Sequence, residues 1–188
     1  MICVIYAHPY PSHSQANRAL LRAVRSVAGV EVRSLYDLYP DFDIDVAAEQ
    51  AALTRARLIV WMHPVYWYSV PGLLKHWLDQ VLAYGWAYGD NAHALRGKHC
   101  LWVATAGGDD KAYSPQGVHE QAFANFVPPI EETARFCGMQ WEEPFVTLGS
   151  HLIGEPALHE RAGRLARRLE EWVAAAPGDE PVNAEAAP

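Results

Sequence analysis

Five short apolar segments recur along the chain, and the stretches between them carry helical patterns. The segments are, in order, Ile2 to Ala7, Val30 to Leu35, Leu58 to Met62, Cys100 to Thr105 and Phe145 to Leu148. Strands that alternate with helices are typical of βαβ units, which place parallel strands in one sheet. The first, third and fourth segments are almost wholly apolar, as strands buried on both faces are, whereas the second alternates and is expected at an edge.

Five parallel strands of this length favour the flavodoxin-like order 2-1-3-4-5, with helices on both faces of the sheet. In that order a crevice opens at the carboxyl ends of strands one and three, so the loops after strands one, three and four should meet there. The sequence therefore predicts an α/β fold with one domain over residues 1–176. The Pro, Gly, Glu and Ala-rich residues 177–188 are expected to be a disordered tail.

Composition limits the function. A formal net charge of −7 and a pI near 5.7 argue against general nucleic-acid binding. The three cysteines have no redox or zinc spacing, and the nine histidines have no metal-ligand spacing, so no metal site is expected. Neither a signal peptide nor a membrane span is evident, and we expect a cytoplasmic protein.

Three large aromatic residues follow the third strand, in the run Val65, Tyr66, Trp67 and Tyr68. Loops at the carboxyl ends of parallel strands face ligands more often than bulk solvent. The run therefore indicates a site for a flat ligand. The alternative is that these rings only pack over the next expected helix, Gly72 to Leu82.

The loop after the first strand ends where an anion site is expected. Ser12 or Ser14 can cap the helix that follows, and amide N–H groups at a helix start bind anions. Arg18 in the first turn opposes the helix dipole, which a nearby phosphate would explain. A cap without a ligand is the alternative. The chain lacks a G-x-G-x-x-G motif and a Walker lysine motif, which disfavours a dinucleotide fingerprint or a P-loop.

The loop after the fourth strand carries paired glycines, Gly107 and Gly108, followed by Tyr113 and His119. Glycines let backbone N–H groups approach a flat ring closely. The tyrosine and histidine supply hydrogen-bond donors, and His119 can carry charge near neutral pH. Each residue alone is explained by a surface tyrosine or a structural histidine. Together, on a loop too long for a simple connection, they favour function.

These segments resemble the flavin-dependent NAD(P)H:quinone oxidoreductases, the DT-diaphorase family, from Met1 to about Trp172. Within that family the chain is most similar to the ancillary proteins of glutathione-regulated potassium efflux. The resemblance rests on the runs Ile5-Tyr6-Ala7-His8-Pro9-Tyr10-Pro11, Ser34 to Phe42, Trp86-Ala87-Tyr88-Gly89, and Gly107 to His119.

The resemblance implies a role for each matching residue. The positions that hold the flavin phosphate and ribityl chain match His8, Ser14, Gln15, Ala16 and Asn17. The positions that flank the isoalloxazine match Val65, Tyr66, Trp67, Tyr68, Thr105, Ala106, Gly107 and Gly108. Tyr113 and His119 match the catalytic pair that supports the reduced flavin, and with Tyr88 from the other subunit they match the quinone pocket. Tyr66 replaces a usual glutamine and Ala106 a common threonine, so contacts there are expected to use backbone groups.

The family implies FMN as cofactor, with FAD as an alternative, and NAD(P)H as hydride donor to a quinone or other planar electrophile. It also implies a homodimer and a membrane potassium-efflux antiporter as partner, which would hold the protein at the inner face of the cell membrane. One alternative is a regulatory subunit of that antiporter with a structural or sensory flavin. A one-electron carrier is disfavoured, because it has no need of Tyr113 and His119.

Overall fold

The computed structural model describes residues 1–175, in which every strand pair is parallel. The strands are β1 (Ile2–Tyr6), β2 (Val30–Ser34), β3 (Leu58–Pro64), β4 (His99–Thr105), β5 (Gln140–Trp141) and β6 (Phe145–Thr147). Their order is β2-β1-β3-β4-β5, and β6 also pairs with β4. The predicted order and the edge position of the second strand are confirmed. The predicted tail, residues 177–188, lies outside the described residues.

The edge of the sheet next to β4 contains two short strands, where the sequence predicted one, Phe145 to Leu148. There β5 pairs with the start of β4, at His99 and Cys100, and β6 pairs with its end, from Val103 to Thr105. The sequence Glu142-Glu143-Pro144 separates the two strands. Proline has no N–H for the ladder, so the pairing is interrupted there and resumes at Phe145.

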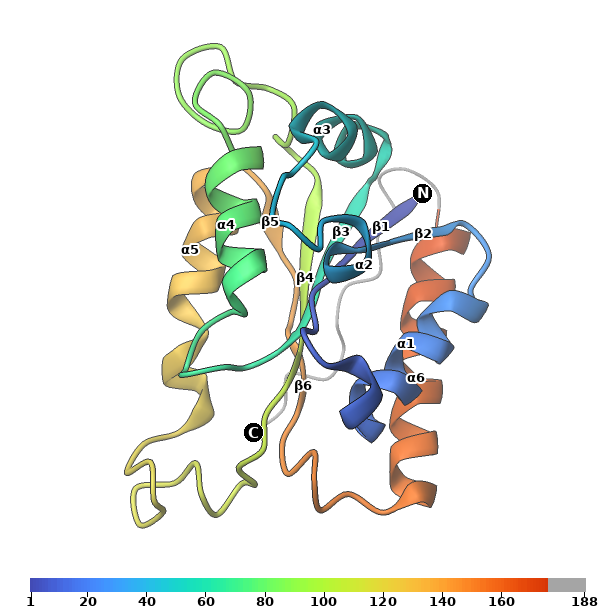
Figure 1. The fold of residues 1–188 in the computed structure, drawn as a ribbon, viewed down its shortest axis with the longest axis vertical. Coiled ribbons are helices and arrows are strands. Elements are labelled where there is room, and N and C mark those ends of the chain that lie inside the picture. Colours follow the sequence, from blue (N-terminus) through green and yellow to red (C-terminus); the bar gives the residue numbers. More distant parts are fainter. Residues whose placement is uncertain (176–188) are drawn as a thin grey trace.

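Helices cover both faces of this sheet (Figure 1). Helices α1 (Gln15–Ser26) and α6 (Glu155–Ala174) pack against one face, over a core that includes Val4, Val60 and Trp172. The other face is covered by α2 (Leu35–Leu38), α3 (Val46–Arg55), α4 (Gly72–Val81) and α5 (Pro128–Phe136). Two short 3-10 helices, Pro11–His13 and Phe123–Phe126, lie in the loops after β1 and β4.

The strand register brings the loops together. Tyr6 pairs with Met62, Pro64 pairs with Thr105, and Thr105 pairs with Thr147. The loops after β1, β3, β4 and β6 therefore start at nearly the same level, at the lower end of the molecule in Figure 1. This end is where ligands bind in open parallel sheets.

Candidate active site

The start of α1 contributes a side-chain amide to this end of the sheet. Ser14 caps the helix, and its hydroxyl accepts from the backbone N–H of Asn17 at 3.2 Å. The amide nitrogen of Asn17 donates to Ser14 at 3.0 Å and to the hydroxyl of Thr105 at 2.8 Å. Asn17 is 2% exposed, and its oxygen Oδ1 has no hydrogen-bond partner among residues 1–175. A buried acceptor without a donor is costly, so it suits a ligand hydroxyl.

His8 is oriented by the main chain. Its Nδ1 accepts from the backbone N–H of Tyr10 at 3.0 Å, and burial is the main cause that lowers the pKa of His8. The neutral ring therefore carries its proton on Nε2, which is a donor. A donor at this position suits a phosphate or hydroxyl oxygen.

The turn after β3 holds two aromatic residues in a strained backbone conformation. Tyr66 and Ser69 exchange two backbone hydrogen bonds, at 3.1 and 3.0 Å. Between them Trp67 has φ 50° and Tyr68 has φ 62°, a left-handed conformation that costs roughly 1–2 kcal/mol per non-glycine residue. Trp67 is also 92% exposed. Strain and exposure of this kind are typical of a functional turn rather than of core packing.

The base of this turn is fixed by hydrogen bonds to its neighbours. The N–H of Val65 donates to the carbonyl of Thr105 at 2.7 Å. The buried His63 accepts from the indole of Trp102 at 2.8 Å through Nε2, and its Nδ1 donates to the carbonyl of Pro64 at 2.9 Å. Burial lowers the pKa of His63 to about 4, which keeps the ring neutral and the network intact.

Gly107 and Gly108 lie against aromatic rings. A Cβ on Gly107 would be 3.1 Å from the ring of His151, in the loop after β6. A Cβ on Gly108 would be 2.9 Å from Tyr113 and 3.1 Å from Nε2 of His119. A Cβ at either position would therefore press against these rings, which would have to shift. His151 was not predicted, because only the loops after the first, third and fourth strands were expected at the site.

Tyr113 and His119 form a stacked pair with ring centroids 4.2 Å apart. Nδ1 of His119 is 3.3 Å from the hydroxyl of Tyr68, so the pair also contacts the strained turn. Phe126 stacks on Tyr68 with centroids 5.0 Å apart. Burial is the main cause that raises the pKa of Tyr113, so its hydroxyl stays protonated. The pair thus offers two donors beside Gly108.

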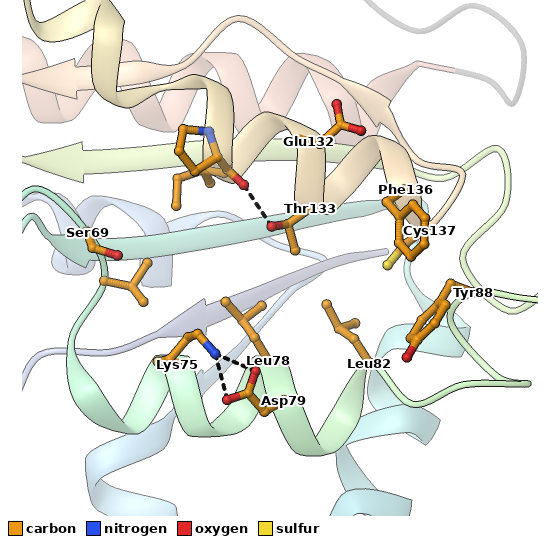
Figure 2. A pocket seen from close by; sticks show the side chains of 13 residues that line it. Ser69, Lys75, Leu78, Asp79, Leu82, Tyr88, Glu132, Thr133, Phe136 and Cys137 are labelled. Carbon is orange, nitrogen blue, oxygen red and sulfur yellow. Dashed lines mark hydrogen bonds and ion pairs between the residues drawn. The ribbon is translucent and has the colours of Figure 1, made fainter.

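Tyr88 lies apart from these residues within one chain. It lines a groove of about 630 Å³ between α4 and α5, where its ring centroid is 5.1 Å from that of Phe136. Figure 2 shows Tyr88 at one end of this groove and Ser69, in the strained turn, at the other. We refer to this feature as the α4–α5 groove.

The remaining predicted residues are placed around the same loops. Gln15 is exposed, whereas Ala16 and Ala106 are buried, so contacts from these two alanines would come from backbone groups. Within residues 1–175, no three His, Cys, Asp or Glu side chains gather as a metal ion requires. Over the same range, no helix has the length and apolar character needed to cross a membrane.

Comparison with known proteins identifies the class. Residues 1–173 match the family described as having a flavodoxin-like fold, and the chain belongs to this family. The glutathione-regulated potassium-efflux system ancillary protein KefF of Enterobacter sp. (strain 638) is 50% identical over 172 residues, which cover 92% of this chain and 97% of that protein.

Two solved structures extend the comparison. General stress protein 14 from Treponema denticola, crystallised in complex with FMN, is 36% identical with a TM-score of 0.80, over 92% of this chain and 97% of that one. A putative quinone reductase from Klebsiella pneumoniae is 25% identical with a TM-score of 0.74, over 94% and 86% of the two chains.

Proposed function

We propose that this chain is an FMN-dependent NAD(P)H:quinone oxidoreductase that also serves as the ancillary protein of a glutathione-regulated potassium-efflux antiporter. The observation that carries the enzymatic part is the stacked pair of Tyr113 and His119, held against Gly108 and beside the strained turn. The fold, the FMN complex of one relative and the quinone reductase name of another support it. When bound, FMN supplies two-electron transfer from NAD(P)H to a quinone.

The residues present fit this cofactor. A phosphate and the hydroxyls of a ribityl chain would suit the N-terminal turn of α1, the Nε2 proton of His8 and the Oδ1 acceptor of Asn17. Gly107 and Gly108 let the backbone approach a flat ring system. The exposed rings of Trp67 and Tyr68 would offer stacking surface to a planar substrate.

The donors of Tyr113 and His119 have a role in the reaction. The loops after β3 and β4 would hold the ring system of FMN, and two-electron reduction would place negative charge there. Fixed donors aimed at developing charge stabilise it strongly where water is excluded. The stack holds both rings in place, so no reorganisation is required when charge develops.

The α4–α5 groove supports a homodimer that completes the site. The groove runs from Ser69 to Tyr88 (Figure 2), and its apolar lining includes Leu78, Ile130 and Phe136. A twofold axis across the groove reverses its direction in the second copy, so Tyr88 of one chain would lie near Ser69 of the other. Tyr88 would then lie on the substrate side of the partner's site, although it lies apart from the site of its own chain.

The ancillary role rests on the 50% identity to a KefF protein over nearly its whole length. It predicts a peripheral position at the membrane through the antiporter. Potassium efflux in cells that carry the antiporter of such a relative, with its own ancillary protein deleted, tests this role. Efflux restored by this chain supports it, and efflux that stays at the deleted level contradicts it.

An absorbance spectrum of the purified protein, with the released cofactor identified, tests the enzymatic proposal. NADPH added under nitrogen should bleach the flavin absorbance, and a benzoquinone added next should restore it. A protein that binds no flavin, or whose flavin absorbance is unchanged by both NADPH and NADH, would contradict the proposal.

A further inference from the structure

A second cavity lies beside the site and is separate from the α4–α5 groove. It has a volume of about 410 Å³ and lies between the loop after β4, the end of β6 and the first turns of α6. Its lining includes Asp110, Phe123, Leu148, Ile153 and Arg161. This volume falls within the range of small-ligand sites, roughly 300–1,000 Å³. We call it the Arg161 cavity.

Arg161 brings a partly desolvated positive charge to this cavity. Its Nε donates to the hydroxyl of Thr147 at 2.7 Å, and NH2 donates to the carbonyl of Val146. No carboxylate of residues 1–175 forms an ion pair with Arg161. Burial is the main cause that lowers the pKa of Arg161, followed by the charge of Arg164, and the charge of Asp110 acts in the opposite direction. A cation in this state, with donors left over, favours an anionic ligand.

Other walls of the cavity have different chemistry. Asp110 is an acceptor only, which suits sugar hydroxyls rather than a phosphate. Leu148 and Ile153 are half-buried and present apolar surface, which suits a flat base, whereas Phe123 is 8% exposed. A phosphate, a ribose and an aromatic base together describe an adenosine phosphate.

The Arg161 cavity is connected to the proposed flavin site by short links. Asp110 follows Gly108 by two residues, and the N–H of Gly149 donates to the carbonyl of Gly108 at 2.8 Å. Phe123 lies in the cavity lining and contacts the ring of Tyr113 edge-on, with centroids 5.1 Å apart. A dinucleotide whose nicotinamide lies beside Gly108 can therefore extend its other half toward Arg161.

We propose that the Arg161 cavity binds the adenosine-phosphate half of NAD(P)H, with Arg161 on a phosphate and Asp110 on a ribose hydroxyl. This inference rests on the proposed function, because it assigns the second half of the hydride donor. Arg161 then determines affinity for the donor without contacting the reacting atoms.

Calorimetric binding of adenosine 2′,5′-bisphosphate and 5′-AMP tests the inference without turnover. We expect wild type to bind at least one of them, and Arg161→Gln to weaken that binding about tenfold or more. Arg164→Gln is the matched control, since Arg164 is exposed on the same helix and is not part of the cavity lining. No binding to wild type, or equal losses in the two variants, would overturn the inference.

Kinetics give a second readout. Arg161→Gln should raise the KM for NADPH about tenfold and leave the KM for reduced nicotinamide mononucleotide, which lacks adenosine, unchanged. Because Arg161→Gln also loses bonds to Val146 and Thr147, Asp110→Asn serves as a second variant that leaves those bonds intact. It should raise the KM for NADPH about threefold. Equal increases in the KM for NADPH and for reduced nicotinamide mononucleotide would overturn the inference. A wild-type protein that binds the adenosine phosphates through Arg161 but oxidises no NADPH would contradict only the proposed function.

Discussion

Gly117 packs directly onto the backbone of Lys111, so closely that a Cβ on the glycine would overlap the carbonyl oxygen of Lys111. The contact closes the loop after β4 on itself, and the N–H of His119 then donates to the carbonyl of Ala112 at 3.1 Å. Tyr113 and His119, six residues apart in sequence, become neighbours through this closure.

Gly117→Ala should therefore separate Tyr113 from His119, the proposed catalytic pair. The added methyl group meets backbone atoms, which cannot move aside as a flexible side chain can. We expect quinone turnover to fall at least tenfold while the melting temperature changes little, because the loop is on the surface. Gly72→Ala is the control, since a Cβ there meets nothing within 4 Å. Wild-type turnover in Gly117→Ala would argue against a need for loop closure.

Removing one donor at a time tests the role of the pair. Tyr113→Phe and His119→Phe keep an aromatic ring in the stack, and each removes one donor near Gly108. Loss of one donor of this type lowers kcat roughly 10²–10³-fold in well-studied sites, and we expect a decrease of at least tenfold in each variant. Stopped-flow flavin reduction and cofactor content are the measurements. His159→Gln, on the exposed face of α6, should behave as wild type. Unchanged reduction rates would remove the pair from the reaction.

The buried His63 predicts a loss of stability in acid. Its pKa is lowered from the ordinary 6.5 to about 4 by burial, so folding favours the neutral ring. The stabilisation is complete above pH 6.5 and is lost as the pH falls toward 4, since a protonated Nε2 cannot accept from Trp102. The expected loss in the free energy of unfolding is roughly 3 kcal/mol. Urea unfolding between pH 7.5 and 4 measures it, and His63→Gln should show a correspondingly smaller loss.

The carboxylate of Glu49, which is fully buried, joins the edge strand to two helices. It accepts from Arg33 at 2.7 Å, from the hydroxyl of Tyr39 at 2.6 Å and from the indole of Trp77 at 2.9 Å. Glu49→Gln should lower the free energy of unfolding by roughly 3 kcal/mol, because the half-buried charge of Arg33 loses its buried carboxylate partner. Glu31→Gln, on the exposed side of Arg33, should cost less than about 1 kcal/mol. Similar losses in both variants would contradict a special role for the buried carboxylate.

The sequence predicts some parts of this site better than others, for physical reasons. Apolar runs define β1, β3 and β4, because strands buried on both faces must be apolar. The strand order then predicts that the loops after these three strands meet. The left-handed backbone of Trp67 and Tyr68 was not predicted, since aromatic side chains avoid that conformation unless tertiary contacts impose it. Arg161 was not among the predicted site residues, because only the folded chain shows its contact with β6.

The position of Tyr88 leads to a test of subunit sharing. If Tyr88 serves the site of the partner, Tyr88→Ala and His119→Ala should each lower turnover as homodimers. In a mixed dimer of the two variants, one site has both defects and the other has none. Random mixing gives half mixed dimers with one intact site each, so about a quarter of wild-type turnover should return after refolding the two variants together. Phe136→Asp, which places charge in the α4–α5 groove, should yield monomers by light scattering and lower turnover in parallel. Mixed samples no more active than the average of their parents would show that each chain uses its own Tyr88, or that no dimer forms through this groove.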